Sequence, residues 1–175
     1  MKSCFKMAIK VLAGVLLLGM SLGSVYFSPN GGAKQALVEL IGATTADIDV
    51  AMYSFTSKEL GLALAGATQK GRRVRIVADN GQSAGRSSVL GWLSRYAQVH
   101  LMHEEGERGM MHHKFMVIGD RYLTTGSYNW SINAEKFNNE NLLILKDSDL
   151  ISEFKREFGR LWEHSRPYAE VRGTQ

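Results

Sequence analysis

The sequence predicts one α/β domain in which a mixed, largely parallel β-sheet is flanked by helices on both faces. The chain has 175 residues, of which 45% are hydrophobic and 22% charged, with only two prolines. These values are ordinary for one globular domain and too small for two. Short apolar runs typical of strands alternate along the chain with segments of helical spacing. Such repeated alternation favours a sheet with helices packed on each side.

The predicted helices carry apolar side chains at the spacing of one helical face. In the first helix, this face consists of Ala33, Ala36, Leu37, Leu40 and Ile41. Ser57 is expected to cap a second helix at 58–69, and Gly71 to follow its end. A third helix is expected at 87–97. In the last helix, the apolar stripe consists of Leu150, Phe154, Phe158, Leu161 and Trp162.

The predicted strands are short runs rich in β-branched and aromatic residues. They are expected at 25–28, 48–53, 74–78, 99–102, 115–118, 122–124 and 142–145. The fifth and sixth flank Gly119-Asp120 and are expected to form a pair, whereas the last is expected to be a buried strand. Mobile loops are expected at 81–88 and 104–111.

The first residues have the pattern of an export signal. Lys2, Lys6 and Lys10 precede an apolar run from Val11 to Met20, as in a secretory signal peptide. Residues 1–27 are therefore expected to be a signal peptide or an N-terminal membrane anchor, followed by one domain at 28–165 and a tail at 166–175. The predicted location is periplasmic or secreted, with anchoring to a membrane as the alternative. Cys4 is the only cysteine, which excludes disulfides and thiol catalysis in the domain.

Overall charge gives little support for nucleic-acid binding. The net charge is +4, but after the three leader lysines are set aside, 18 basic residues face 17 acidic ones. Affinity for phosphates must therefore come from local clusters. The strongest cluster consists of Lys70, Arg72, Arg73 and Arg75. Two interpretations are open for it: cations that stabilise a helix C-terminus, or a rim that contacts phosphates.

Two polar motifs indicate a site for phosphoryl chemistry. His112 and Lys114 lie at the start of a predicted strand, where residues two apart share a face and His113 points away. Ser127 and Asn129 follow the next strand at the same spacing. If the two segments are adjacent, a nucleophile or base, a positive charge and two neutral donors converge. This set suits a phosphoryl group whose transition-state charge is spread over its oxygens.

Two further residues belong to this prediction. Glu140 precedes a predicted strand and is a candidate to bind the second nitrogen of His112, which keeps the other nitrogen available for attack. Gly126 is expected to allow a close approach of the backbone.

The order of these residues resembles the HKD motif of the phospholipase D superfamily. Gly126-Ser127-Tyr128-Asn129 begins twelve residues after Lys114, and Glu140 follows Ser127 by thirteen residues. The chain is most similar, over about residues 26–162, to the small single-motif members: bacterial periplasmic endonucleases and the mitochondrial cardiolipin hydrolase-like nuclease. The resemblance implies the α-β-α sandwich of that superfamily.

The resemblance also implies a mechanism. His112 would attack phosphorus to give a phosphohistidine, and His112 of a second subunit would protonate the leaving oxygen and then activate water. Lys114, Ser127 and Asn129 would bind the phosphate oxygens, and Glu140 would orient His112. The active unit would be a homodimer, without a metal or other cofactor.

One position departs from the family pattern, and two features have alternative interpretations. The family's Asp five residues after Lys114 is replaced by Gly119, and Asp120 comes one place later, so it is left out of the catalytic set. A metal site could instead be built from His100, His103, His112 and His113, but their spacing matches no zinc pattern. Trp130 is expected either to stack on a base or, preferably, to pack under its loop.

The resulting functional prediction is a non-specific endonuclease that hydrolyses DNA or RNA. Because the same catalytic core serves both substrates, the first alternative is a phospholipid hydrolase of the phospholipase D or cardiolipin type. The second is a catalytically silent nucleic-acid-binding dimer in which Gly119 has disabled the site.

Overall fold

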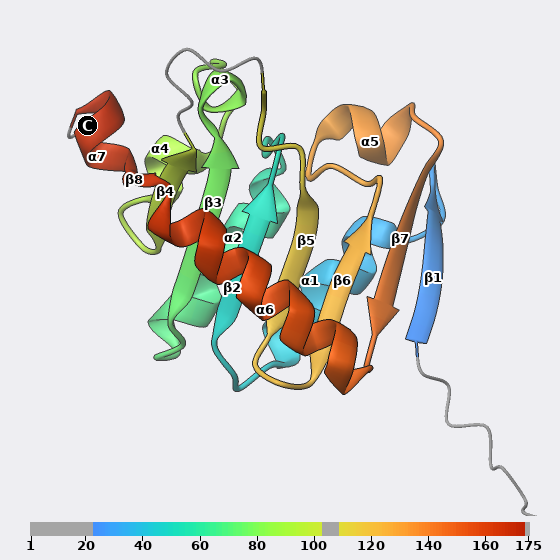
Figure 1. The fold of residues 1–175 in the computed structure, drawn as a ribbon. Helices are drawn as coiled ribbons and strands as arrows, with labels where there is room; N and C mark the ends of the chain where they lie inside the picture. Colours follow the sequence, from blue (N-terminus) through green and yellow to red (C-terminus); the bar gives the residue numbers. More distant parts are fainter. Residues whose placement is uncertain (1–22, 103–108, 174–175) are drawn as a thin grey trace, which may run out of the picture.

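The computed structural model describes residues 23–102 and 109–173, and its centre is one β-sheet (Figure 1). The strands in this part of the chain are β1 (Gly23–Ser28), β2 (Ile48–Met52), β3 (Val74–Asp79), β4 (Gln98–Met102), β5 (Lys114–Ile118), β6 (Tyr122–Gly126), β7 (Glu140–Leu145) and β8 (Arg166–Pro167). Their spatial order is β1-β7-β6-β5-β2-β3-β4-β8. The helices described are α1 (Ala33–Ala43), α2 (Lys58–Gln69), α3 (Asn80–Ser83), α4 (Leu90–Leu93), α5 (Ile132–Lys136), α6 (Ser148–Glu163) and α7 (Tyr168–Arg172).

The α/β class is confirmed, but the prediction of a largely parallel sheet is wrong. In the described residues only β2–β3 and β3–β4 are parallel pairs. The pairs β1–β7, β2–β5, β4–β8, β5–β6 and β6–β7 are antiparallel. The short turn between β5 and β6 requires an antiparallel pair. The pairs β1–β7, β2–β5 and β4–β8 join strands from distant parts of the chain, so the sequence pattern did not specify their direction.

Helices cover both faces of the sheet, as the sequence predicts. Figure 1 shows α1 and α2 on one face and α6 running across the other. Side chains alternate accordingly along the strands. Val50 and Ile76 belong to the hydrophobic cluster that contains the apolar faces of α1 and α2. Ala51 and Val77, the next residues along, pack in a second cluster with Phe158 of α6.

The α2 boundaries agree with the prediction, and the structure gives the reasons. The Ser57 hydroxyl accepts a hydrogen bond from the Leu60 backbone N–H at 3.4 Å, which caps the first turn. Gly71, just after the helix, has a φ of 83°, a left-handed conformation that glycine adopts easily.

Other elements differ from the predictions. The helix expected at 87–97 is reduced to α4, a single turn followed by further turns. In α6 the buried residues are Ile151, Phe158 and Leu161, whereas Leu150 is 43% exposed. The strand expected to be buried is β7, but only Leu142 in it is buried because β7 lies beside the edge strand β1.

Regular structure extends beyond the expected domain at both ends. β1 begins at Gly23, within the segment expected to be a leader, and pairs with β7 along its whole length. β8 and α7 occupy part of the expected tail, and β8 pairs with β4. The rest of the expected leader, and 104–108 of the expected mobile loop, lie outside the described residues. No helix in the described ranges is long and apolar enough to cross a membrane.

Candidate active site

Sheet topology brings the predicted site residues to the same end of four neighbouring strands, which forms one edge of the sheet. β5 is antiparallel to both of its neighbours, so its first residue lies beside the last residues of β2 and β6. Met52 pairs with Lys114, and Gly126 pairs with Leu142. The start of β5, the ends of β2 and β6 and the start of β7 therefore form one continuous edge.

His112 and Lys114 lie together on the aromatic ring of Tyr53, the residue after β2. The His112 ring meets the Tyr53 ring edge-on, with 4.4 Å between centroids. The Lys114 Nζ lies 4.9 Å from the centre of the same ring and donates a hydrogen bond of 2.7 Å to the His112 carbonyl. The predicted common orientation of His112 and Lys114 is observed.

His113 points to the opposite side of the chain. Its Nε2 lies 3.1 Å from Oε1 of Glu157 in α6, and its ring packs edge-on against Phe115. This contact places His113 on the α6 face of the sheet, away from Tyr53.

Ser127 and Asn129 lie directly after β6 and are held by neighbouring backbone groups. The Ser127 Oγ accepts a hydrogen bond of 3.1 Å from the Asn141 backbone N–H. The Asn129 Oδ1 accepts one of 3.3 Å from the Ser54 backbone N–H, which leaves the amide nitrogen to donate to a substrate. Gly126 has a φ of 151°, and a Cβ there would lie 2.2 Å from the Asn141 carbonyl oxygen. The predicted close approach at Gly126 is therefore to β7.

Glu140, the first residue of β7, acts electrostatically on Lys114. Partial burial lowers the pKa of the Lys114 ammonium, and the negative charge of Glu140 opposes this by raising it. The Glu140 Oε1 accepts a hydrogen bond of 2.9 Å from the Asn138 side chain. Among the hydrogen bonds of the described residues none joins Glu140 to His112, so the geometry places Glu140 in the site without the expected contact.

Tyr53 is the residue that the sequence prediction missed. It lies in the segment Ala51-Met52-Tyr53-Ser54-Phe55-Thr56, which contributed to the family resemblance without being given a role. Its position as the last residue of a predicted strand was the available signal, since residues at strand ends gather at one edge of a sheet. Its contacts with His112 and Lys114 depend on the pairing of β2 with β5, which the sequence does not state.

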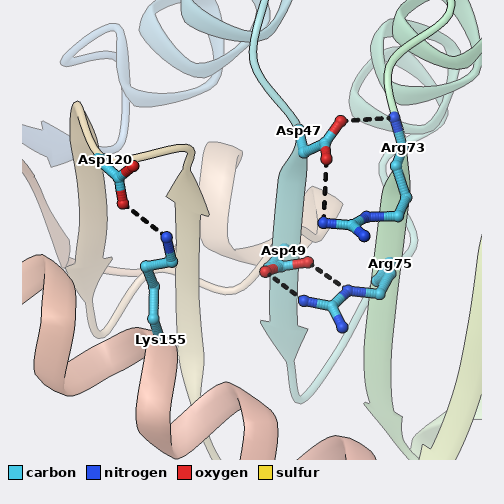
Figure 2. A network of polar contacts seen from close by, with 6 residues as sticks. All are labelled: Asp47, Asp49, Arg73, Arg75, Asp120 and Lys155. Carbon is cyan, nitrogen blue, oxygen red and sulfur yellow. Dashed lines mark hydrogen bonds and ion pairs between the residues drawn. The ribbon is translucent and has the colours of Figure 1, made fainter.

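The basic cluster is mostly paired and lies at the opposite edge of the sheet. Figure 2 shows Arg75 against Asp49, with two hydrogen bonds of 2.8 Å, and Arg73 against Asp47 at 3.0 Å. Asp49 raises the pKa of the Arg75 guanidinium. Both arginines lie towards the start of β3, whereas His112 lies near the ends of β2 and β3. Neither arginine is placed to bind a phosphate at His112.

Arg72 fits the helix-terminus interpretation of the cluster. It donates hydrogen bonds to the carbonyl oxygens of Thr44 and of Lys70, the residue that ends α2. The guanidinium thus satisfies a carbonyl at the end of the helix.

Asp120 is separated from His112 by the whole of β5. It lies in the turn to β6 and forms an ion pair of 2.6 Å with Lys155 of α6 (Figure 2). Gly119 has a φ of 51° and donates its N–H to the Asp47 carbonyl oxygen. Asp120 therefore links the turn to α6, which agrees with its omission from the catalytic set.

Burial decides between the two interpretations of Trp130, and His100 has aromatic and hydrogen-bond partners within the domain. Trp130 is only 1% exposed and packs edge-on against Phe55 with 5.0 Å between centroids, so it cannot stack on a base. His100 stacks on Trp162 at 3.7 Å, and its Nδ1 lies 3.1 Å from the Ser165 hydroxyl. Burial lowers the pKa of His100. His103 lies outside the described residues.

Comparison with known proteins identifies relatives of the whole domain. Residues 37–162 match the family model described as "Cardiolipin synthase, PLD-like domain". The chain is 38% identical to human mitochondrial cardiolipin hydrolase over 140 residues, which are 79% of this chain and 55% of that protein. It thus spans about half the length of the curated relative.

Solved structures with the same fold include two bacterial proteins. NucT from Helicobacter pylori superposes with a TM-score of 0.78 and 26% identity, covering 83% of this chain and 98% of NucT. The phospholipase D family member Nuc from Salmonella typhimurium gives a TM-score of 0.73 and 26% identity, over 83% of this chain and 97% of Nuc.

These relatives correct one prediction and establish the family. The predicted periplasmic or secreted location is wrong, because the similar curated proteins are named mitochondrial enzymes. The basic and apolar start of the chain is compatible with more than one kind of targeting segment, so it did not determine the compartment. The matched family model covers most of the chain, including His112, Lys114, Ser127, Asn129 and Glu140. The chain belongs to the phospholipase D-like domain family.

Proposed function

We propose that this chain is a metal-independent phosphodiesterase that cleaves nucleic acid through a phosphohistidine intermediate. The observation that carries the proposal is the convergence of His112 and Lys114 on Tyr53 at the sheet edge that also holds Ser127, Asn129 and Glu140. That edge offers an exposed imidazole beside one cation and several polar groups.

In the first step, an unprotonated ring nitrogen of His112 attacks phosphorus. The new N–P bond forms as the bond to one ester oxygen breaks, and a proton from a general acid goes to that oxygen. In the second step, water attacks phosphorus, its proton returns to the same acid, now a base, and the N–P bond breaks. The products are a phosphomonoester and an alcohol, and His112 is regenerated.

Lys114, Ser127 and Asn129 stabilise the negative charge that the transition state spreads over the phosphoryl oxygens. Lys114 supplies a fixed positive charge, and its partial burial strengthens the interaction because water screens it less. The Asn129 amide nitrogen and the Ser127 hydroxyl are neutral donors. The negative charge of Glu140 raises the pKa of Lys114, against the larger lowering by burial.

The general acid must come from a second copy of the chain. Attack and departure are roughly in line, so the acid has to lie on the far side of phosphorus from the nucleophile. His113 cannot serve because it faces Glu157 on α6. A two-fold axis at the sheet edge would bring the partner's His112 opposite the first, giving one composite site per homodimer.

A phospholipid is the second candidate substrate. The curated relatives named cardiolipin hydrolases favour it, although the chain spans only about half the length of human mitochondrial cardiolipin hydrolase. It covers 98% of the bacterial protein NucT and 97% of Nuc. A catalytically silent nucleic-acid-binding dimer is less well supported. All the motif residues are present except the Asp whose place is taken by Gly119, and Asp120 is remote from the site.

The deciding experiment compares hydrolysis of single-stranded DNA, RNA and cardiolipin vesicles by the purified protein, with and without excess EDTA. We expect the nucleic acids to be cleaved in the presence of EDTA, because Lys114 and the neutral donors take the place of a metal ion. Cleavage of cardiolipin alone would favour the lipid hydrolase, and no turnover of any substrate the silent dimer. Loss of activity in EDTA with recovery on adding a divalent ion would contradict the mechanism.

A further inference from the structure

A groove lies beside the proposed catalytic edge of the sheet. It has a volume of about 790 Å³ and lies between the start of α2, the segment that leads into α4, and α5. Its walls include Thr56 and Ser57 from one side and Ser131 from the other. The proposed mechanism uses none of these residues.

The groove adjoins Asn129, one of the proposed phosphate-binding residues, through two chain segments. The backbone N–H groups of Thr56 and Ser57 donate to the Trp130 carbonyl oxygen at 2.8 and 2.9 Å. Two residues before Thr56 and one before Trp130, the Ser54 N–H donates to Asn129 Oδ1. The same two chain segments therefore form first the edge of the catalytic site and then the walls of the groove.

Positive charge is concentrated in this groove. Four basic and two acidic side chains line it, in a domain whose charges are otherwise almost balanced. Of these, Lys34 pairs with Glu59 at 2.8 Å, and Glu135 accepts a hydrogen bond of 2.6 Å from the buried Tyr128 hydroxyl.

The remaining three cations have no ion-pair partner among the described residues. They are Lys58, Arg86 and Lys136, and all three are exposed. Lys58 opens α2, Arg86 lies between α3 and α4, and Lys136 ends α5, so each belongs to a different wall. Cations on three walls complement a ligand that carries several separate negative charges.

We propose that this groove binds the single strand of nucleic acid that flanks the scissile phosphate, an inference that rests on the proposed nuclease function. A single strand carries one negative charge per nucleotide, which matches cations spread along a groove. A phospholipid instead concentrates its phosphate at one end of an apolar molecule. Between the cations, Leu62, Trp92 and Ile132 provide apolar surface on which bases can pack.

The test replaces the three cations by glutamine in the full chain. Variant K58Q/R86Q/K136Q is compared with K70Q/R121Q/K146Q, which loses the same charge at the opposite edge of the sheet, where Lys70 follows α2, Arg121 lies in the β5–β6 turn and Lys146 follows β7. Each triple is combined with His112→Ala so that a labelled dT20 oligonucleotide is bound without being cleaved. Fluorescence anisotropy then gives Kd as a function of salt concentration.

The groove triple is expected to raise Kd by at least about 10-fold and to reduce the slope of log Kd against log salt by about 2, since each single-strand phosphate contact contributes about 0.7. The control triple should match the His112→Ala parent. In the catalytically active background, kcat/KM should fall at least about 10-fold more on the oligonucleotide than on bis(p-nitrophenyl) phosphate, which does not extend into the groove.

Three outcomes would overturn the inference. Equal dT20 binding by the groove and control triples would remove the groove from substrate binding while leaving the nuclease proposal intact. A groove triple that loses binding to cardiolipin vesicles but keeps dT20 binding would assign the groove to lipid. A wild-type protein that neither binds nor cleaves any oligonucleotide would reject the groove inference and the nuclease proposal together.

Discussion

His112 and His113 are adjacent in the chain, but their side chains have different surroundings. His112 is exposed beside Tyr53 and Lys114, whereas His113 contacts Glu157 on the other face of the sheet. This pair gives a matched test. His112→Ala should reduce kcat/KM on a phosphodiester by about 10⁴-fold or more, as for other covalent nucleophiles. His113→Ala should lower it less than about 3-fold, since an exposed ion pair contributes little. Steady-state kinetics on both variants measures the difference, and equal losses would argue against His112 as the nucleophile.

Glu140 and Lys114 predict a specific pH dependence. Burial lowers the pKa of Lys114 and Glu140 raises it. Removing the negative charge in Glu140→Gln should lower that pKa further, so Lys114 loses its proton at a lower pH. The alkaline limb of the kcat profile should therefore move to lower pH. Glu163→Gln, at the end of α6, changes the charge equally and should leave the limb in place. A shift of the limb to higher pH in Glu140→Gln would show that Glu140 does not act through Lys114.

At the scale of elements, the junction of β6 and β7 shapes the site. Gly126 has a φ of 151° and no room for a Cβ beside the Asn141 carbonyl. Gly126→Ala should destabilise the fold by about 2 kcal/mol or more. Gly159 in α6 has open space around it, so Gly159→Ala should stabilise by about 0.5–1 kcal/mol. Urea unfolding curves compare the two free energies of unfolding. If Gly126→Ala left the free energy of unfolding unchanged, this junction would accommodate the Cβ without strain.

Elements with a local signal could be predicted from the sequence. The Ser57 cap and Gly71 fix the ends of α2, and a short turn after Ile118 fixes the β5–β6 pair. Elements that depend on distant partners could not. The direction of β5 beside β2 follows from pairing across the sheet, so the largely parallel prediction was wrong. The exposure of β7 likewise depends on its neighbour β1.

For the candidate site, too, the sequence predicted the local features and not the contacts between distant strands. Alternation along a strand is a local property, so the opposite orientations of His112 and His113 followed from spacing alone. The contacts of Tyr53 and the absence of a Glu140–His112 hydrogen bond depend on how β2, β5 and β7 meet at the sheet edge. Side-chain position within such a junction is not encoded by spacing.

At the scale of the whole molecule, the account requires two chains for one site. Mixing equal amounts of wild-type and His112→Ala chains, after subunit exchange, should leave about a quarter of the dimers with both histidines. Activity should then be about a quarter of that of the same total amount of wild-type protein. Independent sites in each chain would instead give about half. Analytical ultracentrifugation at assay concentration should show a dimer, and a fully active monomer would exclude the composite site.

The central claim is that His112 forms a bond to phosphorus, and trapping that bond tests it most directly. A single turnover on a labelled oligonucleotide is stopped at alkaline pH, where phosphohistidine is stable, and the digested protein is analysed by mass spectrometry. The account predicts a phosphate-linked adduct on His112, none on His113, and none in the His112→Ala variant. Turnover at the normal rate without an adduct on His112, or with the adduct on another residue, would contradict it.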